Sequence, residues 1–399
     1  MQAELNIGLL GHVDHGKTSV TKMLTGTWTD VHSMEIKRGI TIKLGYAETT
    51  IRKCPKCPEP QSFTIDDKCA SCGTPSIAVR KVSFVDAPGH ETLMATVIAA
   101  SSILDGALLI IAANEPCPQP QTKEHKMVLE ILGVKNIVVV QNKVDLVTQE
   151  KAREHHKQIK EFLKGTIYEN APIIPISANY NVNRDLLLGA IERYIPTPKR
   201  DPATEPLLYV ARSFDVNKPG TAIDKLVGGV LGGSVVQGIF KLGDDVELAP
   251  GIARIGKGQP EPIRSRIMSL NAGSERLDSA TSGGLIGIAT TLDPSLAKAD
   301  GLIGNVIGHP GKLPPVRSEL SLEYSLLDRL DFENPSIKEG ETIVVSIGTA
   351  TSIGAAEKVK KNSMHLALKR LVCAPKGAKV AISRRVGQRW RLAGAGKIL

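Results

Sequence analysis

The sequence contains no long apolar run. The longest continuous one, 107–113, is far shorter than the ~20 residues that a membrane-spanning helix needs. We therefore expect no transmembrane helix and no membrane partner. The N-terminal residues Met-Gln-Ala-Glu-Leu-Asn lack both a basic region and a cleavage site, so a secretory signal is not expected either. These absences predict a cytoplasmic protein whose thiols stay reduced.

Acidic residues are missing from the C-terminal segment. The chain has 399 residues and a formal net charge of +9, and the stretch from Lys358 to Leu399 holds twelve Lys or Arg residues but no Asp or Glu. Two interpretations stay open. The segment is either the solvated face of a β-rich tail, or a surface that faces a phosphate backbone or the ribosome.

The first half of the chain alternates strand-like and helix-like patterns, and the length predicts two or three domains. Short apolar runs that indicate buried strands occupy 81–85, 107–113, 136–140 and 171–176. Amphipathic spacing predicts helices over 91–103, 121–132, 149–163 and 183–195. This alternation is typical of a mostly parallel sheet with helices on both faces, which is an α/β domain over 1–200.

The second half of the chain shows a different pattern. After the proline-rich stretch 195–202, short strands alternate with Gly, Pro and Asp turns and no long helical pattern recurs. A second Pro-Gly cluster, 309–315, divides this part again. The predicted strands are 207–216, 228–240, 245–248, 263–270, 285–291, 319–324, 342–347, 364–372, 379–383 and 390–395. We therefore expect two all-β barrel domains, 201–315 and 316–399.

A phosphate-binding loop opens the first domain. Residues 11–18, Gly-His-Val-Asp-His-Gly-Lys-Thr, match the pattern G-x4-G-K-T and lie between an apolar run and a helix start. Backbone N–H groups of such a loop converge on one point, Lys17 reaches the β and γ phosphates, and the Thr18 hydroxyl ligates Mg²⁺. The residues predicted to hold the nucleotide here are Asp14, His15, Gly16, Lys17, Thr18 and Ser19.

A second acidic motif follows the predicted strand 81–85. In Asp86-Ala-Pro-Gly89, the carboxylate of Asp86 is placed to hold the Mg²⁺ shell through water. Gly89 is placed to offer its N–H to a γ-phosphate. The motif alone is weak evidence, but its position about seventy residues after the phosphate loop is typical of two strands that share one metal.

Two further loops predict specificity for guanine. Asp145 of the run Asn142-Lys143-Val-Asp145 can accept hydrogen bonds from guanine N1–H and N2–H, and adenine has no donor at these positions. Lys143 is expected along the face of the ring, and Asn142 is expected to connect this loop to the phosphate loop. The run 177–179 is expected to offer the backbone N–H of its middle residue to guanine O6, and its members are Ser177, Ala178 and Asn179. The sequence thus predicts a domain that binds GTP and GDP.

At this point the chain resembles a known family. The runs 11–18, Arg-Gly-Ile-Thr-Ile at 38–42 and Asp-Ala-Pro-Gly-His at 86–90 look like those of translational GTPases of the elongation factor Tu type. Longer runs resemble the γ subunits of archaeal and eukaryotic translation initiation factor 2, and these runs are 37–46, 113–122 and 212–220. The resemblance implies an α/β P-loop GTPase domain followed by two β-barrels.

The resemblance also implies roles for individual residues. Thr41 matches the switch threonine that binds Mg²⁺ in the GTP state, and His90 matches the histidine that positions the attacking water. Val13 and Ile40 match the apolar pair that gates this histidine. Hydrolysis is then expected to be slow in isolation and stimulated by a partner or the ribosome.

Residues just after the switch segment are candidates for contact with tRNA, and they are Lys43, Gly45 and Tyr46. Tyr46 can stack on a terminal adenine or cover a methionine side chain, and Lys43 can meet a phosphate. The alternative interpretation makes Tyr46 an ordinary strand aromatic that packs on the core.

Four cysteines predict a separate metal site. Cys54, Cys57, Cys69 and Cys72 follow the spacing C-x2-C-x11-C-x2-C, in which four thiolates can meet in one tetrahedron. Zn²⁺ is the expected ion, with rubredoxin-like iron and free or disulfide-linked thiols as the alternatives. A closed site of this kind is structural, and we expect it to hold a small insertion over about 51–79.

The resemblance implies two functional classes, and the GTP-binding motifs alone leave a third. The first is a GTP-dependent carrier that brings initiator methionyl-tRNA to the small ribosomal subunit, as the γ subunit of a heterotrimer with α and β subunits. The second is an elongation-type or specialised aminoacyl-tRNA carrier, and the third is a regulatory GTPase without an RNA partner. The cysteine insertion and the run 43–46 favour the first over the second, while the two extra barrels count against the third.

Overall fold

The computed structural model describes residues 2–29, 44–89, 94–253, 260–327 and 332–399. The chain divides into two compact units, Ala3–Pro198 and Met1–Gln2 with Lys199–Leu399. Among the described residues, none of the helices has both the length and the apolarity that a bilayer crossing requires.

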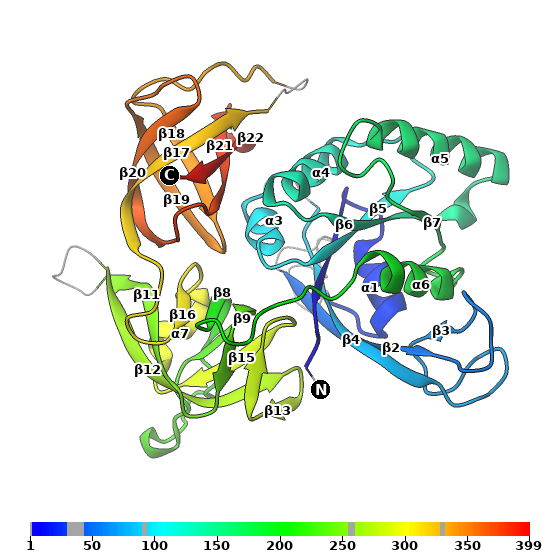
Figure 1. Cartoon of the computed structure of the whole chain (residues 1–399), viewed down its shortest axis with the longest axis horizontal. Helices are drawn as coiled ribbons and strands as arrows, with labels where there is room; N and C mark the ends of the chain where they lie inside the picture. The colour runs from blue at the N-terminus through cyan, green and yellow to red at the C-terminus, as the bar shows by residue number, and fades with distance from the viewer. Residues whose placement is uncertain (1, 30–43, 90–93, 254–259, 328–331) are drawn as a thin grey trace. The chain divides into compact units, whose positions relative to one another are not determined.

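The first unit is built on one mixed sheet (Figure 1). Its strands lie in the order β3-β2-β4-β1-β5-β6-β7, and the part from β4 to β7 is parallel. The strands are β1 (Asn6–Gly11), β2 (Gly45–Lys53), β3 (Phe63–Thr64), β4 (Ile77–Asp86), β5 (Gly106–Ala112), β6 (Asn136–Asn142) and β7 (Ile173–Pro175). The mostly parallel sheet expected from the sequence is confirmed. The exception is β2, which pairs antiparallel with β4, and the connection 54–76 between them contains β3 and no helix.

Helices cover both faces of this sheet (Figure 1). They are α1 (Lys17–Thr25), α3 (Met94–Ser101), α4 (Pro120–Leu132), the short η2 (Val144–Leu146), α5 (Gln149–Leu163) and α6 (Arg184–Tyr194). On one face, α1 and α6 share a core with β1 and β6, and α3, α4 and α5 lie on the other face. Every residue of β5 is buried, which explains why this strand is an uninterrupted apolar run in the sequence.

One histidine of α5 is buried although most residues of this helix are polar or charged. His155 is 3% exposed, and its Nδ1 lies 3.0 Å from Gln141 Nε2. The reason is helical spacing, because His155, Ile159 and Leu163 recur every four residues and form the buried stripe of α5.

The second unit contains two all-β parts. In the first, pairing of β11 with β12 closes the ring β11-β16-β8-β9-β15-β12. Its elements are β8 (Leu207–Phe214), η3 (Ile223–Lys225), β9 (Val230–Gln237), β10 (Ile239–Lys241), β11 (Asp245–Ala253), β12 (Pro260–Ala272), β13 (Glu275–Leu277), β14 (Ser279–Thr281), β15 (Ile286–Thr290), α7 (Pro294–Ala297), η4 (Lys298–Asp300) and β16 (Val306–Gly308). The single strand predicted over 228–240 is split into β9 and β10, because Gly238 between them adopts a φ of 68°.

The second β part is a closed barrel with the order β17-β20-β19-β18-β21-β22. Its strands are β17 (Val316–Leu326), β18 (Thr342–Ile347), β19 (Ala350–Glu357), β20 (Ser363–Cys373), β21 (Lys379–Val386) and β22 (Arg389–Ile398). The sequence missed β19, whose run Ala-Thr-Ser-Ile-Gly-Ala-Ala-Glu buries small side chains and therefore lacks the usual apolar alternation. Two all-β barrels after an α/β domain are thus confirmed.

The segments that join these parts contain neither helix nor strand. They are 195–206, between α6 and β8, and 309–315, between β16 and β17. The predicted domain limits at 200/201 and 315/316 fall in or beside these segments, where prolines prevent a continuous ladder of backbone hydrogen bonds. The basic C-terminal segment lies largely on β20, β21 and β22, and within it Arg384 donates to Glu341 at 2.5 and 2.9 Å.

Arg80 of β4 provides a test of how the sheet holds α6. Its guanidinium donates to Glu192 Oε1 at 2.7 Å and to the carbonyl of Ile191 at 3.1 Å, and Arg80 is buried. We expect Arg80→Leu to lower the free energy of unfolding of the first unit by about 3 kcal/mol, because it leaves the half-buried carboxylate of Glu192 without its cation. Urea unfolding in a Trp390→Phe background, followed by the fluorescence of the remaining Trp28, measures this change.

The control is the double variant Arg80→Leu/Glu192→Leu, which removes both charges and should recover much of the loss. Equal destabilisation of the single and double variants would show that packing, and not the buried ion pair, holds this helix end.

Candidate nucleotide site and metal centre

All the loops predicted to hold the nucleotide lie at one edge of the sheet. Strands β1, β4, β6 and β7 run in the same direction, so their carboxyl ends share that edge. The loops are 11–16 after β1, 87–89 after β4, 142–145 at the end of β6 and 176–179 after β7 (Figure 1). The fold therefore brings together motifs that are far apart in the sequence.

The loop after β1 closes around a lysine. Lys17 is buried, and its Nζ donates to the carbonyls of Gly11 at 3.1 Å and His12 at 2.8 Å. Helix α1 begins at Lys17 without a side-chain cap, and its N-terminus lies at the loop, an arrangement typical of phosphate sites. Gly16 has a φ of 87°, and a Cβ there would lie 2.4 Å from Asn142 Nδ2. The loop thus offers an ammonium group and backbone donors within a small space.

Two of the predicted magnesium ligands meet. The Thr18 hydroxyl donates to Asp86 Oδ2 at 2.8 Å, and Asp86 is fully buried. Hydroxyl and carboxylate oxygens are the donors that Mg²⁺ prefers, so these residues fit that ion. Gly89, three residues after Asp86, lies against the phosphate loop, where a Cβ would be 2.9 Å from the backbone nitrogen of Val13, so a side chain would displace the loop.

A residue that the sequence did not single out joins this pair. Thr29, which follows α1, is buried and donates from Oγ1 to Asp86 Oδ2 at 2.8 Å. Nothing in the sequence around Thr29 indicates this contact. It depends on the fold alone.

Asn142 connects its own loop to the phosphate loop, as predicted from the sequence. It also connects both to the loop after β7. Its Nδ2 donates to the His15 carbonyl at 3.0 Å, and its Oδ1 accepts from the backbone N–H of Ala178 at 3.1 Å. Both bonds are buried, so the phosphate loop and the loop after β7 are held by one amide side chain.

The remaining residues of the predicted base pocket differ in exposure. Asp145 in η2 and Asn179 are exposed, and Lys143 is half-buried with a φ of 61°. Ser177 is buried, and its hydroxyl has no hydrogen-bond partner among the described residues. The Asp145 carboxylate is therefore open to a base.

Several predicted residues lie outside the described part of the chain. They are Ile40, Thr41, Lys43 and His90. Of the others, Asp14 is exposed, and Val13, Ser19 and Tyr46 are half-buried. Gly45 begins β2, where it lies opposite Asp86 in the ladder with β4. The roles given to all these residues stay predictions.

A buried histidine of α4 accepts a hydrogen bond from the phosphate loop. His125 of α4 is fully buried, and its Nδ1 accepts the backbone N–H of Gly11 at 2.8 Å. Burial lowers the pKa of His125 to about 3, so the ring is neutral near pH 7 and Nδ1 keeps its lone pair. His15 in the loop itself is also buried, and burial lowers its pKa to about 4. Sequence analysis missed His125, although its spacing with buried Thr122 and Val128 places it on the inner face of α4.

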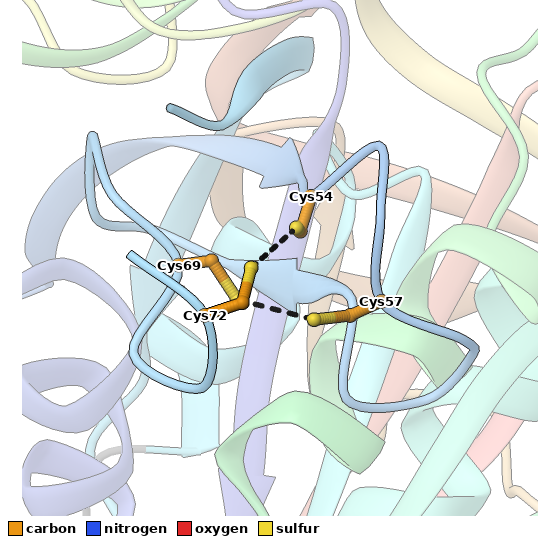
Figure 2. Close-up of side chains that lie close together, drawn as sticks. All are labelled: Cys54, Cys57, Cys69 and Cys72. Carbon is orange, nitrogen blue, oxygen red and sulfur yellow. Dashed lines mark hydrogen bonds between the residues drawn. The ribbon is translucent and has the colours of Figure 1, made fainter. Parts of the chain in front are cut away.

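The four cysteines converge, as Figure 2 shows. Cys54 Sγ lies 3.5 Å from Cys72 Sγ, Cys57 Sγ lies 3.7 Å from Cys69 Sγ, and all four sulfurs are within 4.8 Å of one another. A tetrahedral Zn–S₄ centre with bonds of ~2.3 Å has S–S edges of about 3.8 Å, close to these distances. A disulfide needs about 2.05 Å, so the alternative of linked thiols is wrong here. The group can hold a metal ion.

The cysteines lie in the connection between β2 and β4, which spans 54–76. The insertion predicted at about 51–79 therefore includes the ends of both strands. Phe63 of this connection packs into the core of the first unit, where it contacts Gly189 of α6.

Comparison with known proteins gives consistent matches. Residues 2–197 match the family model described as "Elongation factor Tu GTP binding domain", and residues 318–398 match "Initiation factor eIF2 gamma, C terminal". The chain is 55% identical over 405 residues to translation initiation factor 2 subunit gamma of Methanocaldococcus jannaschii, which covers 100% of this chain and 98% of that protein. It is 53% identical over 400 residues to the same subunit of Archaeoglobus fulgidus, with 99% and 94% covered.

Solved structures share the fold. The bacterial selenocysteine-specific elongation factor EF-Sec matches with a TM-score of 0.77 and 24% identity, over 100% of this chain and 58% of that one. Translation elongation factor SelB from Methanococcus maripaludis, in complex with the GTP analogue GppNHp, matches with a TM-score of 0.74 and 22% identity, over 100% and 79% of the two chains. At these identities the likeness concerns the fold alone.

His125 provides a test of the phosphate loop. We expect His125→Leu to lower the free energy of unfolding by about 1 to 3 kcal/mol, because the buried N–H of Gly11 loses its acceptor. His125→Asn is the matched control, since its Oδ1 can replace Nδ1 as acceptor. Urea unfolding at pH 7 distinguishes the two variants, and equal losses in both would contradict this role.

The same histidine predicts a dependence on pH. Its pKa is lowered from 6.5 to about 3 in the folded chain, so the unfolded chain takes up the proton first as the pH falls. Stability should therefore be fully present above pH 6.5 and decline from there toward about pH 3. His125→Asn should make this decline shallower between pH 7 and pH 5, and an unchanged slope would show that other groups cause it.

Proposed function

The chain belongs to the γ subunits of translation initiation factor 2, and on this premise we propose that it binds initiator methionyl-tRNA in its GTP state and releases it after hydrolysis to GDP. Membership of this family makes it a GTPase of translation initiation with an elongation factor Tu-type GTP-binding domain. The small ribosomal subunit and the α and β subunits of a heterotrimer are the proposed protein and ribosomal partners. We place the protein in the cytoplasm, where ribosomes initiate.

The observation that carries the nucleotide assignment is the pair of hydrogen bonds made by Asn142. They hold the phosphate loop and the loop after β7 in one arrangement, next to the exposed carboxylate of Asp145. That carboxylate can accept two hydrogen bonds from guanine, whereas adenine offers no donor there. The carboxyl-terminal edge of the sheet can therefore bind the base and the phosphates of one nucleotide simultaneously.

Magnesium is the proposed partner of the phosphates. Thr18 and Asp86 would hold it, together with Thr41 in the GTP state, and when bound it neutralises charge on the β and γ phosphates. Lys17 would contribute a second positive charge from inside the loop. His90 would orient the attacking water, with Val13 and Ile40 limiting its approach, and a partner or the ribosome would complete this arrangement.

Zinc is the proposed ion at the four cysteines. A site with four thiolates leaves no open position, so its role is to hold the connection between β2 and β4. Strand β4 leads from this connection to Asp86 over ten residues, which is roughly 30 Å at ~3.3 Å per residue. The metal centre and the nucleotide site are therefore separate.

The proposed tRNA contacts are Lys43, Gly45 and Tyr46. Tyr46 follows Gly45, the residue opposite Asp86, so the strand that carries it begins beside the magnesium residues. This adjacency supports a pocket that depends on the bound nucleotide. An elongation-type carrier is the alternative, and the identity of the charged tRNA that binds separates the two.

The proposal is tested by changing the base that the site accepts. Asp145→Asn replaces an acceptor by a donor, so it should weaken GTP binding about 100-fold, or about 3 kcal/mol, and admit xanthosine triphosphate. The variant should then bind initiator methionyl-tRNA with xanthosine triphosphate but not with GTP. Filter binding with labelled tRNA measures both.

Asp224→Asn, an exposed carboxylate on the first β part, is the matched control and should behave as the wild type does. An unchanged preference for GTP in Asp145→Asn would refute the base pocket. Equal tRNA binding by the wild type in the GDP and GTP states would refute the carrier function.

The metal centre is tested by elemental analysis. Freshly reduced protein should hold one zinc ion per chain, and Cys54→Ser should lose it while GDP affinity stays within about twofold, because the ten residues of β4 lie between the cysteine connection and Asp86. Cys117→Ser, outside the cluster, should keep the ion. Iron in place of zinc, or no metal in the wild type, would overturn the assignment.

A further inference from the structure

We propose that Thr29 is a positioning residue for the nucleotide-bound magnesium ion, acting through the Asp86 carboxylate. The proposal rests on the magnesium site proposed above. Thr29 does not belong to the ligand set that the sequence predicts, and it does not need to touch the ion.

The geometry of the carboxylate carries the inference. Thr18 and Thr29 each donate a hydrogen bond of 2.8 Å to the same oxygen, Asp86 Oδ2. Asp86 is fully buried and Thr29 is 9% exposed, so water does not readily replace the Thr29 hydroxyl. A buried carboxylate held by two hydroxyl donors keeps one orientation.

The hydroxyls of Thr18 and Thr29 have different roles when the magnesium ion is bound. A hydroxyl has one hydrogen and two lone pairs, so Thr18 can ligate Mg²⁺ and still donate to Asp86. The hydrogen bond from Thr29 is independent of the ion. It therefore holds the carboxylate in place both before and after the metal binds.

Gly45 makes this contact possible. It lies opposite Asp86 in the ladder of β2 and β4, and a Cβ at this position would be 2.6 Å from Thr29 Cβ and 3.3 Å from Asp86 Cβ. No side chain fits there without displacing Thr29. This packing of Gly45 against Thr29 and Asp86 is separate from the tRNA contact proposed for the same residue.

The contacts of Thr29 and Gly45 with Asp86 are also relevant to the predicted switch segment. Thr29 and Gly45 stand on either side of the chain segment that contains Thr41, and both pack against Asp86. Thr29 and Gly45 are therefore both held at the carboxylate that is proposed to hold the magnesium shell. Loss of partners of this kind behind metal ligands typically costs 10- to 100-fold in metal affinity.

The test is the release of a fluorescent GDP analogue at a series of free Mg²⁺ concentrations. Thr29→Val keeps the shape but removes the donor, and we expect it to raise the Mg²⁺ concentration for half-maximal retention of GDP about tenfold. Thr29→Ser keeps the donor and should stay within about twofold of the wild type. In EDTA, all three proteins should release GDP at the same rate.

Gly45→Ala is a second variant that leaves both hydroxyls in the chain but displaces Thr29, and it should raise the Mg²⁺ requirement as Thr29→Val does. The proposal is overturned if Thr29→Val keeps the Mg²⁺ dependence of the wild type, or if Thr29→Ser behaves as Thr29→Val does. Faster release in EDTA as well would also overturn it, since this would indicate general damage to the pocket. If GDP release from the wild type does not respond to Mg²⁺, the magnesium site itself is refuted, and this inference with it.

Discussion

Parallel pairing of β1 with its two neighbours is the constraint on which the nucleotide site depends. It brings the ends of β1 and β4 together, so that Leu9 lies opposite Asp86, and it aligns β5 and β6 beside them. Carboxyl ends of parallel strands meet at one edge, where loops are free to vary while the sheet stays rigid. The phosphate loop, the Asp86 motif and the base loops then share one small region, although they span most of the first unit.

Within that region, buried polar groups hold the loops by satisfying one another. Lys17 is paired with loop carbonyls, Asn142 bridges the phosphate and base loops, and His125 accepts the N–H of Gly11. An unpaired buried polar group would cost about 1 to 3 kcal/mol, so each bond favours a single loop arrangement over the alternatives. A site that is ordered in this way loses little further entropy when a ligand binds.

The antiparallel pair of β2 and β4 connects the four-cysteine cluster with the nucleotide site. One end leads to the four cysteines of the connection 54–76, a group that can hold a metal ion. The other end holds Asp86, with Thr29 and Gly45 packed against it. A metal ion held by these cysteines would be separated from Asp86 by the length of β4, so its charge would be largely screened at the nucleotide site.

The sequence by itself determined the short-range features of this protein. The loop 11–18, the Asp86 motif, the run 142–145 and the spacing of the cysteines are local patterns, and the alternation of apolar runs is enough to predict a mostly parallel sheet and two barrels. Only the tertiary structure decided which distant residues support them. Thr29 is 57 residues from Asp86, and His125 is 114 residues from Gly11. Neither a threonine after a helix nor a histidine within one carries a local pattern that identifies its partner, because such contacts are set by strand pairing and helix packing across the whole domain.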